Sequence, residues 1–208
     1  TIIGVDAQTA GGADGVINAS EHASGVTLTG TVTGGDAVVV TIAGVDYAAT
    51  VTGSTWTLDL DRGVLAEGEY SVDATVTATD AAGNSSSTTS TIVVDTETSV
   101  TVNTATVGGS DNVVNGAEHP GGVTLTGTAQ PGASVVVTLG TVSQTVIATS
   151  GGTWTASYAA ADVPTGEVDL PVNVVATDAA GNTASATGSV SGDTFVNDLQ
   201  MTSNSAGG

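Results

Sequence analysis

This 208-residue chain contains a set of carboxylate and amide side chains that could bind a ligand. The set occurs twice, in the same order along the sequence. Carboxylate and amide oxygens are the groups that Ca²⁺ prefers, about six to eight of them per ion, and they commonly come from loops. Their spacing differs from that of an EF-hand loop. We therefore predict calcium sites of another kind, with these ligands: Asp14, Asn18, Glu21, Asp80, Asp95, Glu97, Asp111, Asn115, Glu118, Asp178 and Asp193.

The chain contains residue types that take part in catalysis, but their positions in the sequence do not form a known catalytic motif. The two histidines, His22 and His119, have no nearby nucleophile that would complete a Ser–His–Asp triad, and we interpret them as exposed loop residues. Close carboxylate pairs such as Asp59 and Asp61 occur in glycosidases, but a small β-sandwich offers little cleft for a substrate. We expect no enzymatic activity and no organic cofactor.

Trp56 and Trp154 occupy matching positions and allow two interpretations. An exposed indole could stack on a sugar ring. A single large side chain among many Val and Ala residues is better explained as the filler of a core. We predict that both tryptophans are packed inside.

The charge balance excludes several classes of partner. The chain has 21 acidic residues against one Lys or Arg, so it cannot neutralise nucleic-acid phosphates or bind an anionic membrane surface. Cysteine is absent, which excludes disulfides and thiolate zinc sites. No apolar run is long enough to span a membrane, and we expect any export signal to lie outside this chain. Divalent cations are the first candidate to offset a net charge of −20.

The chain contains two copies of one sequence repeat. Matching residues of the two copies are 97 positions apart at first and 98 positions apart after one inserted residue. The clearest matching segments are 14–22 with 111–119, 25–31 with 122–128, and 79–84 with 177–182. A repeat of this size is typical of an Ig-like domain. We predict domains at 1–95 and 96–193, with 194–208 as the first strand of a third repeat or as a disordered tail.

Each repeat contains about seven strand-like runs separated by turn residues. The clearest run is 69–79, where apolar residues alternate with Ser, Thr and Asp. The other runs of the first repeat are 2–5, 26–32, 37–42, 45–52, 55–60 and 87–94. Sustained helical periodicity is absent, and the best candidate for a helical turn is 63–67. The fold class predicted is all-β: two tandem Ig-like β-sandwich domains with about seven antiparallel strands each.

Sandwich topology suggests where the acidic residues would meet. The loop after the first strand lies at the end where the chain exits, and the turn between the sixth and seventh strands lies at the entry end. End-to-end stacking would bring Asp14, Asn18, Glu21 and Asp95 toward Asp178 of the next repeat. The corresponding set in the second repeat is Asp111, Asn115, Glu118 and Asp193.

Five motifs of the first repeat resemble those of the bacterial Ig-like repeats in giant surface adhesins, of the RTX, type I secreted, biofilm or ice-binding kind. They are Asp-x-Val-Ile-Asn-x-x-Glu at 14–21, Val-Thr-Leu-Thr-Gly-Thr at 26–31, Gly-x-x-Trp at 53–56, Ala-Thr-Asp-Ala-Ala-Gly-Asn at 78–84, and Val-Asp-Thr at 94–96. The resemblance implies an extracellular extender, stiffened by Ca²⁺ at its junctions, that projects a distal ligand-binding domain. It places linker ligands at Asp14, Glu21, Asp95 and Asp178. The family's proline after the linker Asp is missing, because Glu97 and Thr98 stand there.

Two main classes of function remain open at the level of sequence, beside a third, an accessory domain of a secreted enzyme, which only flanking sequence could test. The first is a calcium-rigidified spacer of a cell-surface adhesin, monomeric, whose partners are neighbouring Ig-like repeats of the same chain. The second is an Ig-like module that binds a glycan or a protein through its loops or tryptophans. A spacer should show no glycan binding. Replacement of Trp56 by Ala should then lower the stability of the fold without changing the affinity for a ligand.

Overall fold

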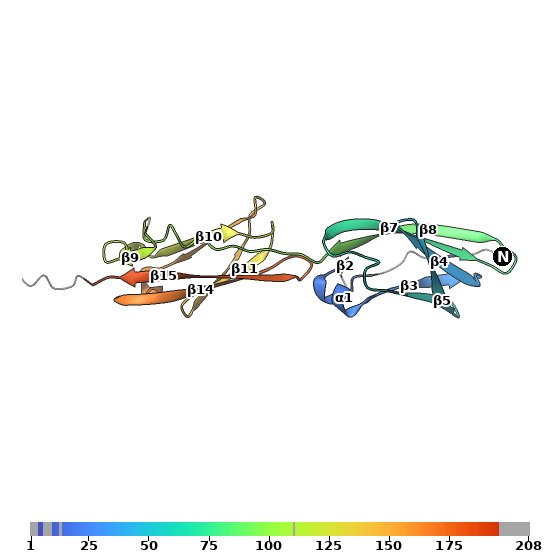
Figure 1. Cartoon of the computed structure of the whole chain (residues 1–208), viewed down its shortest axis with the longest axis horizontal. Coiled ribbons are helices and arrows are strands. Elements are labelled where there is room, and N and C mark those ends of the chain that lie inside the picture. The colour runs from blue at the N-terminus through green and yellow to red at the C-terminus, as the bar shows by residue number, and fades with distance from the viewer. Residues whose placement is uncertain (1–3, 6–9, 13, 110, 196–208) are drawn as a thin grey trace, which may run out of the picture. The chain divides into compact units, whose positions relative to one another are not determined.

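β-Strands build both halves of the chain in the computed structural model, which describes residues 4–5, 10–12, 14–109 and 111–195 (Figure 1). The chain divides into two units. The first contains the residues up to 97 together with 179–182, and the second contains the rest of the described chain from residue 98. The short segment 179–182 thus belongs to the first unit although it is distant in sequence. In the described part of the chain, no helix has the length and apolar character needed to cross a bilayer.

The strands of the first unit run in the order β1-β3-β6-β5-β4-β7-β8-β2. Its elements are β1 (Gly4–Val5), β2 (Val16–Ile17), α1 (Ala19–Ser24), β3 (Val26–Thr33), β4 (Ala37–Ile42), β5 (Val45–Thr52), β6 (Thr55–Leu60), β7 (Glu69–Thr79) and β8 (Ser85–Asp95). Strand β5 pairs with β4 along 45–49 and with β6 along 50–52. It therefore links the two layers of the sandwich.

The second unit contains a two-stranded sheet, β10-β13, and a five-stranded sheet in the order β12-β11-β14-β15-β9. Its elements are β9 (Val113–Asn115), η1 (His119–Gly121), β10 (Val123–Thr128), β11 (Ser134–Leu139), β12 (Val142–Ile147), β13 (Thr153–Tyr158), η2 (Ala160–Asp162), β14 (Glu167–Thr177) and β15 (Thr183–Asp193). Long hairpins, β7 with β8 and β14 with β15, pair over eleven residues in each unit.

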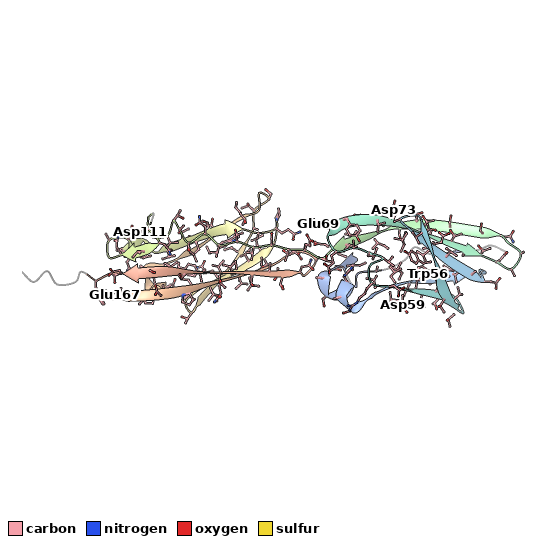
Figure 2. The ribbon with its side chains drawn as sticks, in the orientation of Figure 1. Trp56, Asp59, Glu69, Asp73, Asp111 and Glu167 are labelled. Atoms are coloured by element: carbon pink, nitrogen blue, oxygen red, sulfur yellow. The ribbon has the colours of Figure 1, made fainter. Side chains whose placement is uncertain are left out.

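The core of each unit follows the alternation seen in the sequence. In β7, Ala74, Val76 and Ala78 are fully buried. Trp56 is 0% exposed and Trp154 is 2% exposed, and Figure 2 places Trp56 within the ribbon of its unit. The structure therefore confirms both the packing interpretation of the tryptophans and the all-β, Ig-like sandwich fold.

Two features differ from the sequence-based prediction. A helix forms at Ala19–Ser24, whereas 63–67 is irregular. A helix of six residues is too short to show periodicity, and its formation depends on its first residues. The short strands β2 and β9 pair in parallel with β8 and β15, so the sheets are not purely antiparallel. The predicted tail, 194–208, lies outside the described residues from 196 onward.

Candidate functional site

The repeated Asn and Glu of the first loop form a capping box at the start of α1. The Asn18 side chain accepts hydrogen bonds from the backbone N–H groups of Ser20 (2.9 Å) and Glu21 (3.0 Å). In return, the backbone N–H of Asn18 donates to Glu21 Oε2 at 3.1 Å. This reciprocal pattern satisfies N–H groups that a helix end leaves without partners. The spacing Asn-x-x-Glu therefore has a local structural cause.

The second unit repeats this geometry without the α-helix. Asn115 accepts from Ala117 N (2.9 Å) and Glu118 N (3.1 Å), and Glu118 Oε2 accepts from Asn115 N at 3.1 Å. The box precedes η1, whose residues include Pro120. In both units the box fixes one carboxylate oxygen of the Glu.

The other oxygen of each Glu faces a glycine. A Cβ placed on Gly12 would lie 2.6 Å from Glu21 Oε1, and one on Gly109 would lie 3.2 Å from Glu118 Oε1. Both glycines have positive φ, 56° and 87°. The loop backbone thus comes close to a carboxylate oxygen that the box does not use.

Asp14 and Asp111 each close a short turn before β2 and β9. Asp14 Oδ1 accepts from Val16 N at 3.1 Å, and Asp111 Oδ1 accepts from Val113 N at 3.2 Å. Both side chains are exposed. In each predicted ligand loop, a backbone N–H group therefore holds one oxygen of the Asp carboxylate.

Asp95 and Asp193 end the last strands of their units, and each directly opposes another acidic residue. Asp95 pairs with Glu69 across β7 and β8, and Asp193 pairs with Glu167 across β14 and β15. Figure 2 labels Glu69 and Glu167. Residues directly opposite in antiparallel strands lie about 5 Å apart at Cβ, and like charges there are destabilising. Glu69 and Glu167 were not among the predicted ligands, because the register in which two strands pair cannot be read from residue types.

A threonine follows each of these aspartates and ties the chain to a glycine at the start of the long hairpin. Thr96 N donates to Gly68 O at 3.0 Å, and Gly68 N donates to Thr96 Oγ1 at 2.8 Å. Thr194 makes the same two bonds with Gly166, at 3.2 and 2.6 Å. This Thr–Gly clasp holds the residue after the last strand of each unit against the start of the long hairpin. Glu97, the next residue in the first unit, is exposed.

Asp80 organises the turn between β7 and β8. Its Oδ1 accepts from Ala82 N (2.9 Å) and Asn84 N (2.8 Å), and its Oδ2 accepts from Asn84 Nδ2 at 2.8 Å. These hydrogen bonds stabilise the charged form, that from the Asn84 side chain most, and hold the pKa of Asp80 below its ordinary value of 3.8. Its counterpart Asp178 is 8% exposed.

Asn182 ends the corresponding turn after β14, and its side chain bonds to Ala19 and Asp95. Its Oδ1 accepts from Ala19 N at 2.8 Å, and its Nδ2 donates to the carbonyl oxygen of Asp95 at 2.8 Å and to Asp95 Oδ1 at 3.3 Å. Asn182 is 6% exposed and belongs with Ala19 and Asp95 to the first unit. Asn182 was not among the predicted site residues. Its position in the repeated segment 177–182 was the one feature of the sequence that could have indicated a role.

The histidines are structural, which corrects their interpretation as exposed loop residues. His22 Nε2 lies 2.9 Å from the Leu65 carbonyl oxygen, and His119 Nε2 lies 2.8 Å from that of Val163. Both histidines are half-buried, and both carbonyls belong to buried residues. The imidazole of His22 in α1 therefore bonds to the segment that follows β6, and that of His119 in η1 to the segment that follows β13.

Among the predicted calcium ligands, Asn18 with Glu21 and Asn115 with Glu118 are paired through the capping boxes, whereas Asp95 and Asp193 each face a glutamate that was not predicted. Within the described residues, no three His, Asp or Glu side chains gather closely enough to hold a metal ion. The donor chemistry nonetheless suits calcium, because hard carboxylate oxygens oppose one another at the strand ends and the Glu oxygens beside Gly12 and Gly109 are not used by the boxes.

Comparisons with known proteins point to surface adhesins. Residues 3–96 match the family model of the bacterial Ig-like domain. A 1.5-MDa bacterial ice-binding adhesin, studied for host cell surface retention, is 29% identical, with a TM-score of 0.53 over 93% of this chain and 65% of that one. A Ca²⁺-stabilized adhesin with which an Antarctic bacterium binds ice is 34% identical, with a TM-score of 0.50 over 94% of this chain and 49% of that one. The chain thus spans less than two thirds of either structure, and no curated protein matches it.

Proposed function

Because this chain belongs to the bacterial Ig-like domain family, we propose that it is a calcium-rigidified spacer of a cell-surface adhesin. Its role is mechanical and non-catalytic: it holds a distal ligand-binding region away from the cell, for adhesion or biofilm formation. Its domains are 1–95 and 96–193, its partners are neighbouring repeats of the same chain, and it acts outside the cell as a monomer. The similarity to two adhesins over more than nine tenths of the chain supports this role.

The observation that carries the calcium proposal is the facing of Asp95 with Glu69 and of Asp193 with Glu167. Without a cation, each pair opposes folding by about 0.2–1 kcal/mol. The name of one similar protein, a Ca²⁺-stabilized adhesin, supports the choice of ion. The predicted ligands that would hold it are Asp14, Asn18, Glu21, Asp95, Glu97 and Asp178, and in the second repeat Asp111, Asn115, Glu118 and Asp193; Asp80 would serve an upstream repeat. Glu69 and Glu167 join them, because they face Asp95 and Asp193 across the long hairpins.

Bound calcium supplies positive charge that offsets the repulsion and links loops that are otherwise separate. Extracellular calcium modules bind in the range of about 10⁻⁴–10⁻³ M. Binding to the folded state alone adds about 1.4 kcal/mol per site when free calcium is about ten times Kd. A spacer of this kind would be flexible at the low calcium concentration of the cytosol and rigid at the higher concentration outside the cell.

Small-angle scattering of the full chain tests the proposal. In excess calcium we expect an elongated particle with little flexibility, and in EDTA a flexible one. Identical profiles in the two buffers would show that calcium does not stiffen the chain.

A charge-neutralising variant separates the ligand role of Asp95 from its structural role. Asp95→Asn keeps an oxygen for the bond from Asn182 but removes the charge opposite Glu69. In EDTA its unfolding free energy should equal or exceed that of the wild type by up to about 1 kcal/mol. In excess calcium the calcium-dependent gain should fall by about 1 kcal/mol or more. Asp46→Asn, in β5 and bonded to Thr41, is the matched control and should keep the full gain.

Glycan stacking on tryptophan is not favoured as a second function. Trp56 and Trp154 are both buried, so neither indole offers a face to a sugar.

A further inference from the structure

The second unit has an open strand edge at the place where the first unit is closed. In the first unit, β5 pairs with β4 and then with β6, so one strand joins the two sheets. In the second unit, β12 pairs with β11 along its whole length, and its other side has no strand partner in the described part of the chain. The side chain of Gln144 crosses to the other sheet, where its Nε2 donates to the Ser157 carbonyl of β13. Strand β12 is therefore the edge of its sheet.

The first repeat carries a charge on the strand that corresponds to this edge, and the second repeat does not. Asp46 of β5 lies opposite Thr41 and accepts a hydrogen bond from its hydroxyl at 2.7 Å. Ser143 of β12 holds the same place opposite Thr138, and the two hydroxyl oxygens lie 2.8 Å apart. A charge on an edge strand hinders its pairing with another chain. The edge of the second repeat lacks this protection.

The loss of charge extends over the neighbouring strands. Asp59 of β6 corresponds to Ser157 of β13, and each lies opposite a threonine. Between Glu118 and Asp162 the sequence contains no Asp, Glu, Lys or Arg, whereas the corresponding segment of the first repeat, 22–64, contains five charged residues. The uncharged stretch includes β10, β11, β12 and β13. These four strands are thus neutral in a chain whose net charge is −20.

Apolar side chains are exposed beside the edge. Val136 of β11 pairs with Val175 of β14, and Ile147 at the end of β12 is 61% exposed. All three lie on the outer face of the sheet, because Val135 and Val137 on either side of Val136 are fully buried in the core. Strand β12 itself, Val-Ser-Gln-Thr-Val-Ile, contains neither proline nor charge. An uncharged edge rich in β-branched residues is the kind that pairs with a strand of another chain.

The charge distribution also indicates the partner. A basic protein would be attracted to the acidic regions of this chain and not to its neutral strands. A second copy of the chain is repelled by those acidic regions, so two copies approach most easily through neutral surfaces. We propose that β12 of one copy pairs antiparallel with β12 of a second copy across a two-fold axis, so that the two five-stranded sheets join edge to edge.

This contact goes beyond the proposed spacer function and rests on it for its setting. One short edge gives weak association, so the chain is a monomer in dilute solution. Where spacers of neighbouring cells lie side by side, many such contacts act together and hold the spacers to one another.

Analytical ultracentrifugation of the full chain tests the proposal, in EDTA so that calcium cannot bridge acidic residues. We expect the average mass to rise from that of a monomer toward that of a dimer as the protein concentration approaches the millimolar range. Added NaCl should strengthen the association, because it screens the repulsion between two chains of net charge −20. A monomer at every concentration would overturn the proposal.

Ser143→Asp places on β12 the charge that Asp46 places on β5, opposite a threonine that can again donate to it. It should weaken the self-association at least about tenfold, because each dimer contact then contains two like charges. Ser185→Asp is the matched control: it adds the same charge to exposed β15 of the same sheet, away from the edge, and should retain the association. Trp fluorescence verifies that both variants fold. Equal association of Ser143→Asp and the wild type would overturn the proposal.

A spin label locates the contact without changing β12. The chain contains no cysteine, so Thr141→Cys, in the turn before β12, gives a single site for a nitroxide. The labelled chain is mixed with an unlabelled, isotope-enriched copy at a concentration where the wild type associates. We expect amide signals to broaden most around Ile147, because antiparallel pairing brings the start of one β12 beside the end of the other. Broadening centred on another part of the chain would overturn the proposal. Because EDTA is present throughout, both results are independent of the scattering test for calcium.

Discussion

Gly30 of β3 and Trp56 of β6 face each other across paired strands, so closely that a Cβ on Gly30 would lie 2.6 Å from the indole Nε1. Gly127 and Trp154 repeat the arrangement, with a Cβ at 2.5 Å from the ring. The largest side chain of each core is thus accommodated only because its strand partner has no side chain. This explains why Gly stands inside a strand, where it otherwise weakens the pairing.

Gly30→Ala should therefore destabilise the first unit by about 1–3 kcal/mol, because the indole must move within a packed core. Urea denaturation followed by Trp fluorescence measures this. Gly121→Ala is the matched control, since a Cβ there would meet no atom within 4 Å. Equal stability of the two variants would show that the core has room that the structure does not indicate.

Thr96→Val should lower the unfolding free energy by about 1–3 kcal/mol, because Gly68 N loses the hydroxyl that accepts its bond. Thr96→Ser keeps this acceptor and should remain within about 0.5 kcal/mol of the wild type. Urea denaturation of both variants checks the Thr–Gly clasp. A Val variant as stable as the Ser variant would contradict it.

Asn84→Ala should raise the pKa of Asp80 toward 3.8, because the Asn84 side chain is the leading cause of its depression. A carboxyl with a lowered pKa in the folded state contributes stability above pH 3.8, and this contribution is lost as the pH falls through the folded-state pKa. Carboxyl carbon NMR against pH measures the shift directly. An unchanged Asp80 titration in the variant would contradict the prediction.

Tyr158 should make stability fall at high pH. Its hydroxyl donates to the Val137 carbonyl at 2.7 Å, and burial raises the pKa of this tyrosine above 10.0. The folded state holds the proton more tightly, so the contribution is full below pH 10 and is lost as the pH rises toward the folded-state pKa. Unfolding free energies across this range check the trend. Tyr158→Phe should cost about 1 kcal/mol at neutral pH and flatten the alkaline decline, to which Tyr70 also contributes.

The local pattern of the sequence predicted the strands well. The runs 37–42, 45–52, 55–60 and 69–79 coincide with β4, β5, β6 and β7, because alternation and turn residues act over a few neighbouring positions. The burial of Trp56 followed from the small residues around it. The helix at Ala19–Ser24 was missed, although Asn18 and Glu21 have the spacing of a capping box.

By itself, then, the sequence determined the repeat, the strands and the tryptophan-filled core, since each depends on residue type and on near neighbours. Only the tertiary structure decided that Asp95 opposes Glu69 and that Asn182 bonds Asp95, a contact spanning 87 residues. Register and side-chain hydrogen bonding arise from segments that meet after folding. For that reason the bond from Asn182 to Asp95 could not be inferred from the turn sequence that Asn182 shares with Asn84.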